Sequence, residues 1–347
     1  MSSEHSWRSV LGRLLAGGDL TEQQAAWAMS EILSDAATSA QIAGLAVALR
    51  VKGETVEELA GMVGALYEHG VPVSVDRRAV DVVGTGGDGA HTVNISTMAA
   101  LVVAGAGAPV VKHGNRSASS LCGAADLVEA LGIPLDLGPD QVSRTVSEVG
   151  IGFCFAPRFH PALRFAGPTR SELGVPTVFN VLGPLANPAR PAAQAVGVAD
   201  PRMAELIAGV FASRAVDAVV FRGDDGLDEL TTSTTSRLWV VRNATVTEER
   251  LDPATLGLPL SEPDALRGGD VAFNAKVAER LLGGEIGPVR DTVLLNAAAA
   301  LAVYYQDTAP SGETFVDRVR RLLPQATEAV DSGAAAGLLE SWVAATR

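Results

Sequence analysis

The first 70 residues alternate apolar and polar positions with the period of amphipathic helices. One apolar stripe at this spacing consists of Trp7, Val10, Leu11 and Leu14. Three later segments begin with a threonine followed by Gln or Glu in the capping-box spacing: Thr21 with Gln24, Thr38 with Gln41, and Thr55 with Glu58. Gly53 and Gly70 stand where helices should end. We predict a small helical bundle domain over residues 1–72, whose core and cap residues carry no chemistry.

After Pro72 the pattern changes to short apolar runs that alternate with helical segments. Strands are predicted at 79–83, 109–112, 151–155, 194–198 and 218–221, with an antiparallel addition at 237–246. Helices are predicted at 272–282, at 291–304 and from 315 to the end. The predicted fold class is α/β, with the N-terminal helical bundle and a larger α/β domain at 73–347, whose mostly parallel central sheet is flanked by helices. The proline-broken segment 161–190 is expected to contribute to the helical domain.

Composition and charge limit the classes of partner. The chain has 347 residues, 47% of them hydrophobic and 19% charged, which is the composition of a globular protein. Its net charge of −13, without a Lys/Arg-rich run, argues against a nucleic-acid partner. Two cysteines make no disulfide framework, and the longest apolar run, 97–111, is too short to span a bilayer. We expect a soluble cytoplasmic protein with no membrane partner.

A glycine-rich loop, Gly84–Gly89, directly follows the first predicted strand and precedes a helix. Its match to a dinucleotide-binding pattern is weak, because the acid expected about 20 residues later is missing from Gly105–Val111. No Lys-Ser/Thr pair closes the loop, so it is not a Walker loop. Glycine backbone N–H groups and a helix N-terminus can still bind phosphate, and Asp88 suggests ribose hydroxyls or a metal nearby. The alternative is a tight structural turn.

Two further polar loops also follow predicted strands. Lys112–Ser120 holds two fixed cations, a histidine, an asparagine and three serines in an otherwise acidic chain. Lys and Arg neutralise phosphate charge, so this loop predicts a second phosphate-binding element. Asp228 and Glu229 offer the carboxylates that suit Mg²⁺, whereas Asp224 and Asp225 are better explained as turn residues. A solvated polar loop is the alternative for each. The three loops together indicate a polyphosphate and metal site.

The motifs GTGGD with NIST, KHGNRSASS, RSELG and GDDGLDEL resemble those of the anthranilate phosphoribosyltransferases of tryptophan biosynthesis, in order and over nearly the whole chain. The resemblance implies a helical domain and an α/β domain similar to those of pyrimidine nucleoside phosphorylases, and a homodimer formed through the helical domain. A phosphorylase should lack the HGNR loop and the Asp-Glu pair. The acidic charge and metal ligands argue against a non-catalytic nucleic-acid-binding relative, and the missing ribose acid against an oxidoreductase. A paralogue that accepts a substituted anthranilate in a secondary pathway stays open.

The resemblance also implies roles for particular residues. The expected phosphoribosyl pyrophosphate site comprises Gly84, Gly87, Asp88, Thr92, Asn94, Ile95, Ser96, Thr97, Lys112, His113, Gly114, Asn115, Arg116, Ser117, Ala118, Ser119, Ser120 and Ala124. The expected metal ligands, for about two Mg²⁺ ions, are Ser96, Asp228 and Glu229. The expected anthranilate contacts are Gly84, Asn115 and Arg170, which the excursion of 161–190 would bring to a domain cleft.

In the implied reaction, the neutral amine of anthranilate attacks the ribose anomeric carbon and pyrophosphate leaves. No covalent nucleophile is needed, and His113 is a weak candidate for the proton acceptor. The chain departs from common family residues at His91, Ala124 and Val175–Pro176, and Ala124 replaces a frequent serine. None of these departures removes a charged ligand of the substrates.

Overall fold

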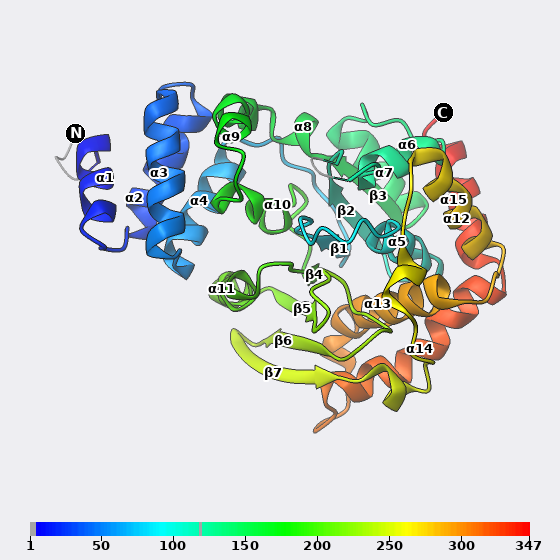
Figure 1. Ribbon diagram of the computed structural model, residues 1–347. Helices are drawn as coiled ribbons and strands as arrows, with labels where there is room; N and C mark the ends of the chain where they lie inside the picture. Colours follow the sequence, from blue (N-terminus) through cyan, green and yellow to red (C-terminus); the bar gives the residue numbers. More distant parts are fainter. Residues whose placement is uncertain (1–4, 118–119) are drawn as a thin grey trace. The chain divides into compact units, whose positions relative to one another are not determined.

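The computed structural model describes residues 5–117 and 120–347, which form two compact units (Figure 1). The first unit combines the N-terminal part of the chain, up to Pro72, with the segment Ala156–Pro188. The second unit combines Val73–Phe155 with Ala189–Arg347. The chain therefore passes between the units three times.

The first unit contains helices only, among the residues that the structure describes. Its helices are α1 (Trp7–Leu15), α2 (Glu22–Leu33), α3 (Ser39–Lys52), α4 (Val56–His69), α8 (Ala156–Phe159), α9 (Gly167–Leu173) and α10 (Leu182–Leu185), with 3₁₀ turns η1 (Pro161–Ala166) and η2 (Val178–Asn180). All three predicted capping boxes are confirmed at the starts of α2, α3 and α4. The capping glutamate Glu58 is buried, and it also accepts hydrogen bonds from the Leu20 backbone N–H, at 2.8 Å, and from Lys52, at 3.0 Å.

The two predicted helix-end glycines serve different purposes. Gly53 ends α3 with φ 91°, a left-handed conformation that suits glycine. Gly70 ends α4 in an extended conformation, with φ −87°. A Cβ at Gly70 would lie 2.8 Å from the Leu66 carbonyl oxygen and 3.0 Å from the ring of His160. Gly70 is therefore required for the close approach of a neighbouring segment, which the helix-end pattern alone does not predict.

The second unit is built on a seven-stranded sheet in the order β3-β2-β1-β4-β5-β6-β7. Its strands are β1 (Val80–Gly84), β2 (Val110–Gly114), β3 (Ile151–Phe155), β4 (Ala193–Gly197), β5 (Asp217–Gly223), β6 (Ser236–Arg242) and β7 (Thr245–Leu251). Strands β1 to β5 pair in parallel, and β5, β6 and β7 pair antiparallel. The predicted α/β fold class, including its antiparallel edge, is confirmed. The parallel strands are mostly apolar and buried, as expected for a sheet covered on both faces.

Helices cover this sheet, and Figure 1 shows α11 and α13 on opposite sides of β4 and β5. The helices of this unit are α5 (Ile95–Gly105), α6 (Ala124–Ala130), α7 (Pro139–Glu148), α11 (Pro201–Ser213), α12 (Val271–Leu282), α13 (Pro288–Tyr304), α14 (Phe315–Asp331) and α15 (Ala334–Ala345). The single helix predicted from 315 to the end is wrong, because Gly333 adopts a left-handed φ of 76° and separates α14 from α15. Within the described residues, no helix is both long and apolar enough to span a membrane.

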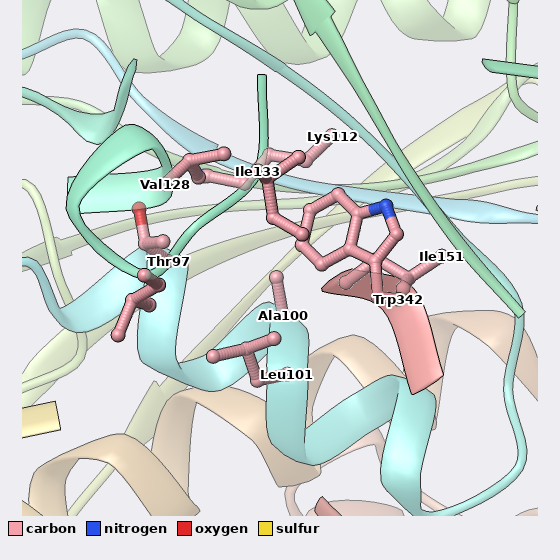
Figure 2. A pocket seen from close by; sticks show the side chains of 9 residues that line it. Thr97, Ala100, Leu101, Lys112, Val128, Ile133, Ile151 and Trp342 are labelled. Atoms are coloured by element: carbon pink, nitrogen blue, oxygen red, sulfur yellow. The ribbon is translucent and has the colours of Figure 1, made fainter. Parts of the chain in front are cut away.

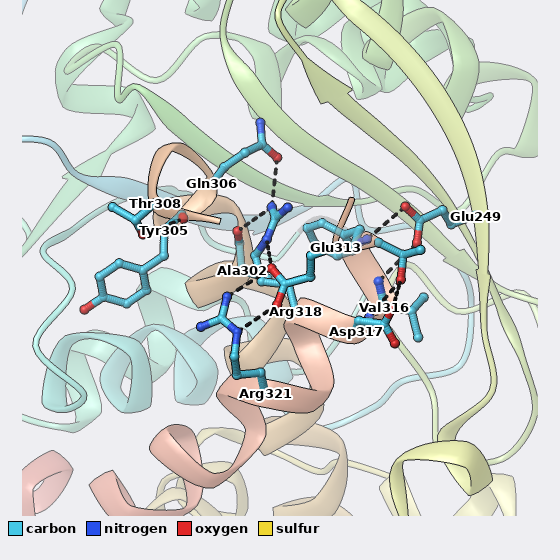
Figure 3. Close-up of polar contacts among 12 residues, drawn as sticks. Glu249, Ala302, Tyr305, Gln306, Thr308, Glu313, Val316, Asp317, Arg318 and Arg321 are labelled. Carbon is cyan, nitrogen blue, oxygen red and sulfur yellow. Dashed lines mark hydrogen bonds and ion pairs between the residues drawn. The ribbon is translucent and has the colours of Figure 1, made fainter. Parts of the chain in front are cut away.

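Polar contacts at the start of α14 attach it to the sheet and to α13 (Figure 3). The Glu249 carboxylate of β7 accepts from the first two backbone N–H groups of α14, at 2.9 and 3.1 Å. Arg318 is buried and donates to Glu313, at 3.1 Å, and to the Ala302 carbonyl oxygen of α13, at 3.2 Å. Gln306 is also buried and donates to Asp217, at 2.9 Å, at the amino end of β5. The contact of Gln306 with Asp217 therefore lies at the amino ends of the parallel strands.

The last helix closes the core behind α5. The backbone of α15 lies so close to α5 that a Cβ at Gly105 would be 2.7 Å from the Ala335 Cα. Trp342 is buried and borders a small apolar void of about 10 Å³, together with Thr97, Leu101 and Lys112 (Figure 2). This volume is roughly that of one water molecule and too small for a substrate. The void is therefore a packing feature behind α5.

We expect Trp342→Ala to lower stability by about 3–5 kcal/mol, because it removes a large buried side chain and enlarges an existing void. The measurement is thermal unfolding of the variant beside the wild type. Trp342→Phe, which keeps most of the volume, should lose much less. An unchanged melting temperature in the alanine variant would show that α15 contributes nothing to the core.

Candidate functional site

The glycine-rich loop after β1 has a backbone that other residues would not adopt readily. Gly86, Gly87 and Gly89 have φ values of 67°, 83° and 74°. Gly84 is required for a different reason, since a Cβ there would lie 2.3 Å from the Asp228 carboxylate. The loop therefore keeps its backbone accessible and lets one carboxylate approach it closely.

Asp228 lies after β5, and the sheet brings it to the glycine loop after β1. Its carboxylate accepts from the Gly86 backbone N–H at 2.6 Å. A Cβ at Gly197, the last residue of β4, would lie 1.6 Å from the Asp228 carbonyl oxygen. The residues after β5 thus pack directly on the carboxyl ends of β1 and β4. Burial and then the negative charge of Asp88 raise the pKa of Asp228 to about 7.

The Glu229 carboxylate lies at the beginning of α5. It accepts from the Ser96 backbone N–H at 3.2 Å, in the first turn of that helix. Burial and the charge of Asp228 raise the pKa of Glu229 well above its usual range, although Lys112 opposes the shift. The Lys112 ammonium donates to the Ser96 hydroxyl at 3.3 Å and to the Val82 carbonyl oxygen. Burial lowers the pKa of Lys112, and the nearby carboxylates oppose this.

These acidic residues fit a divalent cation that is shared with a phosphate ligand. Asp88, Asp228 and Glu229 repel one another, which helps to raise the pKa values of Asp228 and Glu229. A nearby cation would relieve this repulsion. Among the described residues, no group of three or more His, Cys, Asp and Glu side chains is arranged to hold a metal. Mg²⁺ commonly uses only one or two carboxylates plus substrate phosphates, so Asp228, Glu229 and the Ser96 hydroxyl fit that mode.

The second predicted phosphate loop begins inside β2. His113 is buried, and its backbone N–H donates to the Asp81 carboxylate at 3.2 Å. Gly114 ends β2, where a Cβ would lie 2.9 Å from the Phe153 ring. Asn115 is exposed, and its side-chain oxygen accepts from the Arg116 backbone N–H at 2.7 Å. The loop therefore leaves the sheet at Asn115.

The rest of this loop folds against α6. Arg116 forms ion pairs with Asp126, at 2.6 Å, and Glu129, at 2.9 Å. The hydroxyls of Ser117 and Ser120 lie 2.7 Å apart. Ala118 and Ser119 lie outside the described residues. A phosphate that Arg116 contacts would have to share this guanidinium with the two acids of α6, which is an arrangement that the sequence did not predict.

The remaining residues of the predicted donor site lie around the starts of α5 and α6, and they differ in the contacts that they can make. Thr92 forms an isolated antiparallel bridge with Arg267. Ile95 and Thr97 are buried, and the Thr97 hydroxyl has no hydrogen-bond partner among the described residues. Ala124 begins α6, and its Cβ would lie 3.2 Å from a Cβ at Gly114. Direct side-chain contacts from Ile95 and Thr97 therefore need a different local conformation.

Arg170 belongs to the first unit, on α9. It is partly buried, its guanidinium lies 5.6 Å from the centre of the Phe179 ring, and burial lowers its pKa. Among the described residues, no carboxylate is close enough to affect the pKa of Arg170. A partly buried guanidinium without an anionic partner can bind a carboxylate ligand.

Asp81 is a charged residue that the sequence reasoning missed. It is fully buried within β1, where it accepts from His113 and opposes the lowering of the Lys112 pKa. Its signal in the sequence was a single carboxylate inside the apolar run Ala79–Val83. A buried charge of this kind needs partners, which the structure supplies from β2.

The fold and the site together define a class of transferase. Residues 76–336 match the a/b domain of a glycosyl transferase family, and residues 8–70 match the helical bundle domain of a glycosyl transferase family. An anthranilate phosphoribosyltransferase of Nocardioides sp. is 60% identical over 98% of this chain and 99% of its own length. The anthranilate phosphoribosyltransferase of Thermobifida fusca is 56% identical over 98% of this chain and 97% of its own length.

Solved structures agree with these relatives. Anthranilate phosphoribosyltransferase from Thermus thermophilus superposes with a TM-score of 0.90 at 40% identity, covering 97% of this chain and 99% of that one. The Saccharomyces cerevisiae enzyme in complex with PRPP and Mg has a TM-score of 0.86 at 27% identity, covering 98% and 97%. The same yeast enzyme in complex with 4-fluoroanthranilate also has a TM-score of 0.86, at 25% identity and with 99% of each chain covered. The chain therefore belongs to the anthranilate phosphoribosyltransferase family.

Proposed function

We propose that this chain transfers the phosphoribosyl group of 5-phosphoribosyl 1-pyrophosphate to the amine of anthranilate, giving N-(5-phosphoribosyl)anthranilate and pyrophosphate in tryptophan biosynthesis. The observation that carries this proposal is the contact of the buried Asp228 with the glycine loop at Gly84 and Gly86. A buried carboxylate pair beside backbone N–H groups and Lys112 suits a metal-bound polyphosphate. The relatives named above support the same reaction.

The chain's own groups bind and orient the donor. The backbone of the glycine-rich loop at Gly87–Gly89 can donate to phosphate oxygens, and the N-terminus of α5 adds positive potential. Lys112 contributes a donor beside Ser96. When bound, Mg²⁺ held by Asp228, Glu229 and Ser96 would neutralise charge on the departing pyrophosphate. Stabilising that charge is the main electrostatic task of the site, because the C–O bond to pyrophosphate breaks as the amine nitrogen bonds to the anomeric carbon.

The acceptor site rests on Arg170. Anthranilate carries a carboxylate, and the partly buried Arg170 guanidinium can bind it through two parallel hydrogen bonds. Asn115 and the Gly84 backbone are the proposed further contacts of the acceptor. The amine is neutral at pH 7 and loses a proton during or after attack. His113 is the weak candidate for the group that takes the proton, since it lies buried at the start of the second phosphate loop.

We further propose about two Mg²⁺ ions per site, a cytoplasmic location and a homodimer formed through the helical domain. Apolar side chains exposed on the first unit support the dimer: Val47 and Val51 lie one turn apart on α3, with 42% and 83% of their surfaces accessible, and Leu15 of α1 is 82% accessible. Sedimentation that gives only the monomer mass at micromolar concentration would overturn it.

The decisive test of the function is a fluorescence assay. Purified protein is mixed with phosphoribosyl pyrophosphate, Mg²⁺ and anthranilate, and the loss of anthranilate fluorescence is followed with and without EDTA. We expect metal-dependent loss and stoichiometric release of pyrophosphate. Pyrophosphate release with other aromatic amines but not with anthranilate would keep the donor and overturn the acceptor. Neither donor binding nor turnover would overturn the enzyme assignment.

A further inference from the structure

The segment 266–274, which begins before α12, pairs with residues 91–93, which connect the glycine-rich loop to α5. The Gly268 backbone N–H donates to the His91 carbonyl oxygen at 2.8 Å, and the Val93 N–H donates to the Leu266 carbonyl oxygen at 2.9 Å. A Cβ at Gly268 would lie 2.7 Å from the Thr92 carbonyl oxygen. The two segments therefore lie in backbone contact, which the absence of a side chain at Gly268 permits.

Asn274 adds a side-chain link to this backbone pairing. It is buried, with 2% of its surface accessible. Its Oδ1 accepts from the Gly269 backbone N–H at 2.9 Å, and its Nδ2 donates to Asn94 Oδ1 at 2.9 Å. Asn94 Nδ2 in turn donates to the carbonyl oxygen of Cys122, two residues after the second phosphate loop, at 3.0 Å.

The order of donors and acceptors in this series of hydrogen bonds fixes the orientations of the Asn274 and Asn94 amides. Because the Gly269 N–H requires an oxygen, Asn274 must turn its NH₂ group to Asn94. Asn94 must then use its oxygen for Asn274 and its NH₂ group for the Cys122 carbonyl. A reversed amide at either residue would place two donors or two acceptors together.

Asn94 also stands at the N-cap of α5 but makes no side-chain cap hydrogen bond. Asparagine at this position usually accepts from a first-turn N–H group. Here the Asn94 oxygen accepts from Asn274 instead, and the Ser96 N–H of the first turn donates to Glu229. The Asn94 side chain therefore links the start of α5 to the residues that follow the second phosphate loop, and it does not cap the helix.

We propose that Asn274 is a positioning residue for donor binding, which acts through Asn94 to hold the two phosphate loops together. This inference rests on the proposed function, because it assigns the two loops to phosphoribosyl pyrophosphate. Asn274 itself is buried and is expected to act without touching the substrate. Its effect should appear in the affinity for the donor and not in the chemical step or in the affinity for anthranilate.

The test compares Asn274→Ala, Asn94→Ala and the double variant. We expect Asn274→Ala to raise the KM for phosphoribosyl pyrophosphate about tenfold, because one or two buried hydrogen bonds are lost. The kcat and the KM for anthranilate should stay within about twofold of the wild-type values. The Kd from titration calorimetry with the donor and Mg²⁺ should rise equally. If Asn274 acts through Asn94, the double variant should bind the donor no worse than Asn94→Ala.

Gln306→Ala is the matched control, since it removes a buried carboxamide at the amino ends of the parallel strands, away from the site. It should lower the melting temperature but leave the donor KM within about twofold. If Asn274→Ala does not fold, Asn274→Ser is tested instead, because the shorter serine side chain keeps a polar group but cannot reach Asn94. An unchanged donor Kd, or effects that multiply in the double variant, would overturn the positioning role. A wild-type protein that binds no donor would instead overturn the proposed function.

Discussion

Asp228→Asn is expected to lower kcat/KM at least about 100-fold at saturating Mg²⁺, because it removes one of the two carboxylates proposed to hold the metal on pyrophosphate. The substitution is nearly isosteric. Its side-chain oxygen can still accept from the Gly86 N–H, so the loop should keep its shape. The measurement is steady-state kinetics over a range of Mg²⁺ concentrations, and the Mg²⁺ needed for half-maximal activity should rise.

Without metal, the same variant should be more stable than the wild type. A raised carboxyl pKa means that, between about pH 4 and pH 7, the folded state holds a proton that the unfolded state has lost. The wild type therefore loses stability as pH rises through this window, and Asn, which does not ionise, avoids the loss. The gain in melting temperature should grow from pH 5 to about pH 7 and then level off.

Asp224→Asn is the control for both measurements. Asp224 lies in the same loop, but its carboxylate pairs with Arg250 and Thr235 and not with the glycine loop. We expect activity within about threefold of the wild type and no gain in stability. Full activity of Asp228→Asn would remove Asp228 from the metal site, whereas equal losses in both variants would indicate a disturbed loop.

The sequence predicted those features in which spacing along the chain determines the contact. Capping boxes are local, so the pairs that begin with Thr21, Thr38 and Thr55 were found directly. Parallel strands bring their carboxyl ends to one edge of a sheet, which is why loops 144 positions apart, at Gly84 and Asp228, could be expected to meet. The same alternation of strands and helices supported the α/β fold class.

Features that depend on side-chain partners from distant segments could not be predicted. Asn274 and Asn94 are 180 positions apart, and nothing in their local sequence indicates that their amides meet. Arg116 looked like a phosphate ligand from its loop, but its pairing with Asp126 depends on how that loop folds onto α6. The break at Gly333 also escaped, because the apolar pattern is helical on both sides of it.

Arg170→Ala is expected to raise the KM for anthranilate roughly 30- to 150-fold, which corresponds to about 2–3 kcal/mol for charge-assisted hydrogen bonds to a carboxylate. The KM for phosphoribosyl pyrophosphate should change little, because the donor residues lie in the other unit. Arg170→Lys keeps the charge but loses the planar two-point geometry, so it should recover only part of the affinity.

The measurement is the anthranilate fluorescence assay with each substrate varied in turn. Arg164→Ala is the control: it removes an exposed arginine of η1 in the same unit, which stacks on Phe165 at 4.3 Å. Its anthranilate KM should stay within about twofold of the wild type. A second check offers aniline, which lacks the carboxylate. If Arg170 binds the carboxylate, the wild type and Arg170→Ala should use aniline equally poorly. If the variant instead loses turnover of aniline and of anthranilate by the same factor, Arg170 supports the fold or the chemical step and does not bind the acceptor carboxylate.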